Sequence, residues 1–211
     1  MLCSDLLVEC HDLVALCAPE LVADVPLYVM ALPEECPRPV ATRAFASTQN
    51  LAPLRAFIES RGLWRGPGRM IAFCQDDIGA EDALGIALHE AAHLLPAGPV
   101  DDPPHAAELI DAQVAAFSRF LLTDVDFEPT PCEYHGADFL RICCHLQHRA
   151  KLAGFELPFP ALVEGWHYQR PPLVRFARVL GDEPDRMLGC SFAEILSQPA
   201  PAEFLELSKG D

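Results

Sequence analysis

The sequence predicts an α+β fold in which a small mixed β-sheet packs against several helices. Short runs rich in β-branched and aromatic residues come first along the chain. Longer runs follow, in which apolar residues recur with the spacing of a helix. Strands and helices do not alternate regularly, so a parallel sheet built from repeated βαβ units is not expected. The strands therefore belong to one small sheet that the later helices cover.

The first half of the chain holds all the predicted strands. Apolar spacing predicts a helix over about 3–18, which Pro19 ends. Strand-like sequences follow at Asp24–Leu32, Thr42–Ser47 and Arg69–Gln75. A further helix is expected at about 50–62, before the last of these strands.

The second half is predominantly helical. Helices are predicted at Glu81–Leu95, at about 105–122 and at about 136–153, with proline-containing loops between them. Residues 1–154 are expected to form the main domain, and residues 155–211 a mostly helical appendage packed on it. On the helix at about 136–153, the polar side that carries His145 and His148 is expected to be exposed.

Charge and cysteine content limit the partners and the location. The 211 residues include 15 basic and 31 acidic side chains, a net charge of −16, which disfavours direct binding to nucleic acid or to an anionic membrane surface. The sequence shows neither a transmembrane run nor a secretory signal. Its nine cysteines include no CxxC pair, and Cys3, Cys10 and Cys17 recur every seven residues. We expect reduced cysteines, largely in the core of a cytoplasmic protein.

One motif carries chemistry: His89-Glu90-Ala91-Ala92-His93, within the helix predicted at Glu81–Leu95. Histidines four residues apart lie on one helix face, so both imidazoles can reach one Zn²⁺, and Glu90 can serve a metal-activated water. Only about 0.02 such motifs are expected by chance in a chain of this composition. The motif predicts one zinc ion per chain, with Glu90 as general base.

A catalytic zinc of this kind needs a third protein ligand. One candidate is His135, which directly precedes the helix predicted at about 136–153. The others are Glu108 and Asp111, on the helix predicted at about 105–122. If His135 is the ligand, one of these acids could orient a zinc-bound imidazole instead.

With these residues, about 69–153 of the chain resembles the SprT-like metallopeptidases, which include the Spartan-type proteases. The HExxH helix of that group is followed by an HGxxF or HGxxW motif, which HGADF at residues 135–139 matches. The resemblance implies a zincin-like fold with His135 as the third zinc ligand. A weaker match, to the ImmA/IrrE-like metallopeptidases, covers the helix at about 105–122 and implies an acidic ligand of the gluzincin type, Glu108 or Asp111.

The predicted function is zinc-dependent hydrolysis of peptide bonds in a protein or peptide substrate. Glu90 would take a proton from the attacking water and deliver it to the leaving amine. Tyr134, His167 and Tyr168 are candidate donors to the oxyanion. An extended substrate would add to an edge strand, for which Arg69–Gln75 is the candidate.

The alternative is a protein of a different class. A zinc-stabilised binding or regulatory module without catalytic activity could carry the same residues. A site closed by a fourth protein ligand would indicate such a module, and an open site an enzyme. The Spartan-type relatives suggest an association with DNA, but the charge of −16 argues that this chain does not bind DNA itself.

Overall fold

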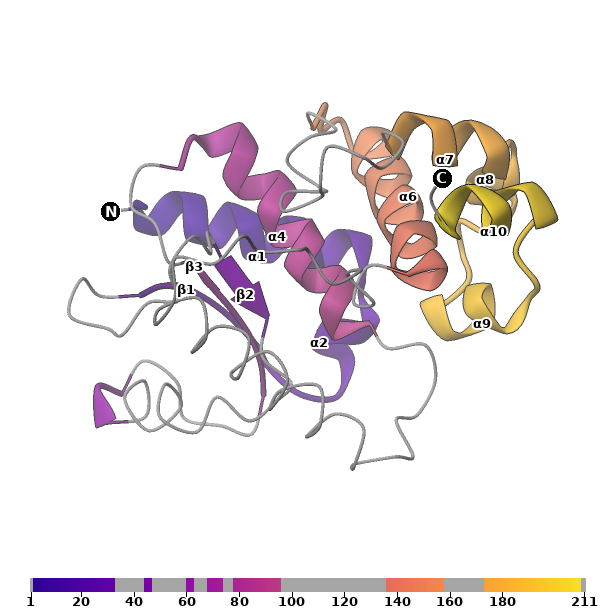
Figure 1. The fold of residues 1–211 in the computed structure, drawn as a ribbon. Coiled ribbons are helices and arrows are strands. Elements are labelled where there is room, and N and C mark those ends of the chain that lie inside the picture. The colour runs from indigo at the N-terminus through magenta and orange to yellow at the C-terminus, as the bar shows by residue number, and fades with distance from the viewer. Residues whose placement is uncertain are drawn as a thin grey trace, which may run out of the picture.

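The computed structural model describes residues 2–32, 44–46, 60–62, 68–73, 78–95, 136–157 and 173–209. These residues combine a small β-sheet with a larger number of helices (Figure 1), which confirms the prediction of a mixed, mostly helical protein. The helix predicted at about 105–122 lies outside the described residues, as does most of the one at about 50–62.

The sheet has three described strands, each inside a predicted strand run. They are β1 (Leu27–Ala31), β2 (Ala44–Ala46) and β3 (Arg69–Phe73), in the order β1-β3-β2. Strand β1 pairs with β3 in parallel, and β2 pairs with β3 antiparallel. The expectation that the third strand forms an edge is therefore wrong, because β3 lies between the other two described strands.

Gly68 permits the close approach of β1 to the start of β3. A Cβ atom at this position would lie 2.7 Å from the carbonyl oxygen of Pro26 and 2.7 Å from a ring carbon of Tyr28. The next residue, Arg69, donates from Nη1 to the carbonyl oxygen of Leu21 at 2.9 Å. The parallel pair thus begins at a point where only glycine fits without displacing its neighbours.

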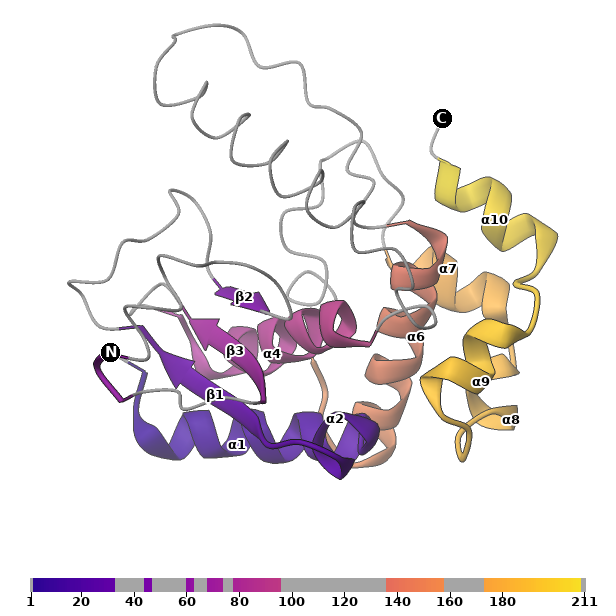
Figure 2. The ribbon, with the colours of Figure 1, turned by 90° about the horizontal axis from the view of Figure 1, so that it is seen from below.

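Two helices lie side by side on one face of the sheet (Figures 1 and 2). Helix α1 (Ser4–Cys17) contacts β1, whereas α4 (Ala80–Leu94) contacts β2 and β3. The inner face of α1 carries Cys10 and Cys17, both with no exposed surface, as the seven-residue spacing predicts. A short helix that was not predicted, α2 (Glu20–Ala23), follows Pro19.

Helix α6 (Ala137–Leu152) joins this layer to the C-terminal helices. It contacts α1 and α4, and also α7, α8 and α10. Gly154, at a φ of +91°, follows its end and provides the left-handed conformation that a helix C-terminus favours. The C-terminal helices lie beyond α6, away from the sheet (Figure 1), and are α7 (Leu173–Leu180), α8 (Glu183–Arg186), α9 (Phe192–Ser197) and α10 (Ala202–Lys209).

The polar side of α6 is partly buried under these helices. His145 is 1% exposed, which corrects the expectation of an exposed face at that residue, whereas His148 keeps 23% of its side chain exposed. Its Nε2 lies 3.0 Å from Oε1 of Glu183, the atom that also accepts a hydrogen bond from Nε of Arg141 at 2.7 Å. The wrong prediction has a physical cause: Glu183, on α8, neutralises and covers polar groups that would otherwise face water.

Arg149, also on α6, connects three separate parts of the chain. Its Nη1 donates to the carbonyl oxygen of Cys17 at 2.8 Å, and its Nη2 to that of Cys190 at 2.6 Å. The guanidinium also lies 4.5 Å from the ring centroid of Phe192. Because Cys17 ends α1, the first of these bonds satisfies a carbonyl that the helix leaves unpaired.

Two further expectations concern the redox state of the cysteines and the presence of a transmembrane helix. Cys3, Cys10, Cys17, Cys143, Cys144 and Cys190 are all free, and of these Cys3 is exposed rather than in the core. In the described ranges, none of the helices has both the length and the apolar character needed to cross a bilayer.

Candidate metal centre

The residues of the HExxH motif lie in the C-terminal half of α4, where the helix is buried on almost every side. Every residue from Ala83 to Ala92 is buried. His89 and Glu90 are only 6% and 7% exposed. Polar side chains are costly to bury unless they have partners. The contacts of His89, Glu90 and His93 therefore indicate which chemistry these residues can support.

The two histidines direct the same nitrogen atom toward each other. Nε2 of His89 lies 3.2 Å from Nε2 of His93, and the ring centroids are 5.0 Å apart at an interplanar angle of 73°. Two imidazole nitrogens that bind one tetrahedral zinc at 2.0–2.1 Å are about 3.3 Å apart. The observed separation therefore fits a shared zinc ion with little movement of either ring.

Glu90 points toward the sheet from the same turn of α4. The backbone N–H of Ala46, on β2, donates a hydrogen bond to its carboxylate. Burial raises the pKa of Glu90 to about 8, although this hydrogen bond acts in the opposite direction. Glu90 is thus a buried carboxyl group with a raised pKa, held between the helix and a sheet strand.

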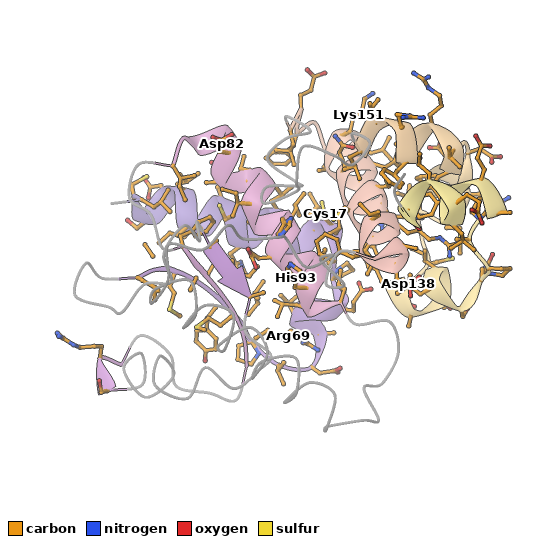
Figure 3. The ribbon with its side chains drawn as sticks, in the orientation of Figure 1. Cys17, Arg69, Asp82, His93, Asp138 and Lys151 are labelled. Atoms are coloured by element: carbon orange, nitrogen blue, oxygen red, sulfur yellow. The ribbon has the colours of Figure 1, made fainter. Side chains whose placement is uncertain are left out.

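An aromatic ring from α6 completes the described surroundings. Phe139 lies with its ring centroid 5.1 Å from that of His89, at 70°, and 4.5 Å from that of His93, at 33°. Figure 3 shows the end of α4 that carries His93 beside the end of α6 that carries Asp138. The first turn of α6 is therefore in contact with the histidine pair.

The other predicted site residues cannot be placed. His135, the third-ligand candidate, lies outside the described residues, directly before Gly136, where the description of α6 begins. The remaining candidates also lie outside them: Tyr134, Glu108, Asp111, His167 and Tyr168. Within the described ranges, no three His, Cys, Asp or Glu side chains are grouped so that they could hold a metal ion. Two of the proposed ligands are thus described, and the third remains a prediction.

The sequence reasoning missed two features of this centre. One is the contact between Glu90 and Ala46, which follows from the pairing of β2 with β3 and has no local signal. The other is the position of Phe139 against both imidazoles. Phe139 is the last residue of the HGADF segment, and this motif indicates an aromatic residue at the position but not its contact with the imidazoles.

Comparison of the chain with protein-family models, with curated proteins and with solved structures finds no match.

Proposed function

We propose that this chain is a zinc-dependent metallopeptidase of the zincin type. The observation that carries the proposal is the 3.2 Å approach of the two Nε2 atoms of His89 and His93, beside a buried Glu90. These residues fit a zinc ion in donor type, in spacing and in the direction of their nitrogens. His135 is the proposed third ligand.

The described part of α6 supports this third ligand. Phe139, in the first turn of the helix, contacts both histidine rings. His135 is only four residues earlier in the sequence, a stretch that spans at most about 14 Å when fully extended. This short link is compatible with an imidazole at this position binding the same ion. Glu108 and Asp111 remain the competing candidates, as ligands or as hydrogen-bond partners of a ligand.

The side chains would divide the reaction between them. A bound zinc ion would supply Lewis acidity, which polarises the peptide carbonyl and acidifies water. Glu90 takes the proton from the attacking water and gives it to the amine nitrogen as the C–N bond breaks. Its carboxyl group is buried beside the histidine pair, and the Ala46 N–H orients it through a hydrogen bond. Tyr134, His167 and Tyr168 remain candidate donors to the oxyanion.

The substrate proposed is an extended peptide. Among the described strands, β1 and β2 lie at the two edges of the sheet, and β2 is the one that contacts Glu90. A peptide added alongside β2 would bring its backbone close to the general base. We therefore assign the substrate edge to β2, in place of Arg69–Gln75. The charge of −16 makes protein or peptide, and not nucleic acid, the proposed partner.

Metal analysis and hydrolysis of an unfolded protein substrate test the proposal together. The purified chain should contain about one zinc, and His89→Ala and His93→Ala should each lose it. Glu90→Gln should retain the zinc but lower hydrolysis by about 10²- to 10⁴-fold. A folded wild-type chain that binds no zinc would refute the proposal. Full zinc occupancy without hydrolysis by the wild type would instead identify a zinc-stabilised binding module.

A further inference from the structure

Phe139 occupies a special position relative to the histidine pair. Its ring meets His89 nearly edge to face and lies tilted against His93. It comes from α6, whereas both histidines come from α4, so it is a contact between helices and not a neighbour along one helix. With 7% of its surface exposed, the ring is also part of the core.

We propose that Phe139 is a positioning residue for the two described metal ligands. The inference rests on the proposed function, because it assigns a role toward the zinc that His89 and His93 would bind. An imidazole rotates broadly about the bond that joins its ring to Cβ. The two ring contacts restrict this rotation on both histidines at once. They thereby hold the Nε2 atoms 3.2 Å apart.

The chemistry of phenylalanine suits this role. Its ring has no lone pair to compete for the ion and no donor to capture an imidazole nitrogen, so both Nε2 atoms remain directed at each other. Its apolar surface covers the imidazole rings where it touches them, and less water there favours metal binding by a neutral imidazole. Ligands that are oriented in advance bind a metal more tightly than ligands that must be ordered on binding.

The test is a Co²⁺ titration of the metal-free full-length chain, followed by the visible absorption of the ion. Phe139→Leu keeps an apolar side chain but removes the ring. We expect it to weaken Co²⁺ binding about tenfold, the lower end of the range for substitutions just outside a metal's ligands. Its absorption band should also change in position or intensity, because the ligand geometry is less restrained.

Phe176→Leu is the matched control. Phe176 is fully buried on α7, and its ring centroid lies 5.4 Å from that of Phe204, so this variant also loses a buried ring and an aromatic contact. It should lower the thermal midpoint by an amount comparable to Phe139→Leu. Its Co²⁺ affinity should stay within about twofold of the wild type, with an unchanged spectrum.

The outcomes separate this inference from the function on which it rests. A wild-type chain that binds no Co²⁺ or Zn²⁺ would remove the premise. If the wild type binds Co²⁺ and Phe139→Leu binds it with equal affinity and an identical spectrum, the positioning role alone is overturned. If Phe139→Leu does not fold, Phe139→Met, which fills more of the same space, must show the same loss of affinity and spectral change.

Discussion

Arg141 and Glu183 form a buried ion pair between α6 and α8, with Nε of Arg141 2.7 Å from Oε1 of Glu183 and only 2% and 5% of the two side chains exposed. Arg141 also donates from Nη1 to the carbonyl oxygen of Gln198 at 2.7 Å. A charged pair in this setting fixes how helices dock, because neither partner can be left alone without a large desolvation cost.

Loss of the arginine should therefore be severe. Arg141→Met should lower the free energy of unfolding by about 3–5 kcal/mol, since it leaves the Glu183 carboxylate buried without its main partner. Urea denaturation measures the loss. Arg175→Ala, an exposed position on α7, should change the free energy of unfolding by less than about 0.5 kcal/mol. Adding Glu183→Gln to Arg141→Met should recover part of the loss, and a further decrease would contradict the assignment.

His145 should make the fold sensitive to mild acid. Burial lowers its pKa below 6.5, and the positive charges of Arg149 and Arg141 act in the same direction, although Glu183 opposes them. The unfolded chain therefore takes up a proton first as the pH falls through 6.5, and stability present above that pH is lost below it. The pKa of Glu183 is also lowered: burial alone would raise it, but the hydrogen bonds from Arg141 and His145 outweigh that effect. Its contribution is lost at lower pH, below its ordinary value of 4.5.

The measurement is the urea midpoint of wild type and His145→Gln at several pH values between about 5 and 7.5. One histidine can contribute at most about 1.4 kcal/mol per pH unit. The wild type should lose stability more steeply than the variant in this interval. If the urea midpoints of the two proteins change with pH at the same slope, His145 binds protons equally in the folded and unfolded states.

The third ligand should be identified by which substitution releases zinc. His135→Ala should lower zinc content to near zero after dialysis against a weak chelator, because two imidazoles alone hold zinc poorly. Glu108→Ala and Asp111→Ala should retain the metal, with at most a 10- to 100-fold weaker affinity if one of them orients a ligand. The reverse pattern would assign the site to the gluzincin type. His167→Ala, a candidate only for the oxyanion, should keep the metal and serves as the control.

The cysteines of α1 should differ sharply in reactivity. Burial raises the pKa of Cys10 to about 12 and that of Cys17 to about 11, whereas Cys3 is exposed. Alkylation requires the thiolate, and each pKa unit lowers the thiolate fraction about tenfold. At about pH 8, iodoacetamide should modify Cys10 and Cys17 at least about 100-fold more slowly than Cys3, as measured by mass spectrometry. All three should react at similar rates in concentrated urea, and similar rates in the native chain would contradict their burial.

Local patterns predicted the elements of this fold well. The helices α1 and α6 and the three strands all fall within the runs predicted for them, and α4 begins one residue before its predicted start. The HExxH spacing correctly placed His89 and His93 on one face of a helix, because helical geometry alone determines that relation.

Relations between distant segments could not be predicted in the same way. The position of β3 between β1 and β2 depends on pairing between segments that are far apart in the sequence, and the residues of a single strand do not determine its neighbours. His145 looked exposed because its partner, Glu183, is 38 residues away. The contact of Ala46 with Glu90 likewise arises only when the sheet packs on α4.

The three contacts of Arg149 also limit how early during protein synthesis the final packing can form. The ribosome delivers α1 and α4 long before residue 190, yet the carbonyl that ends α1 and that of Cys190 share one guanidinium on α6. Phe139 also reaches the histidines only after α6 has emerged. The nascent N-terminal half therefore carries both described histidines without their final packing. Under the proposed function, tight metal binding should follow the emergence of α6.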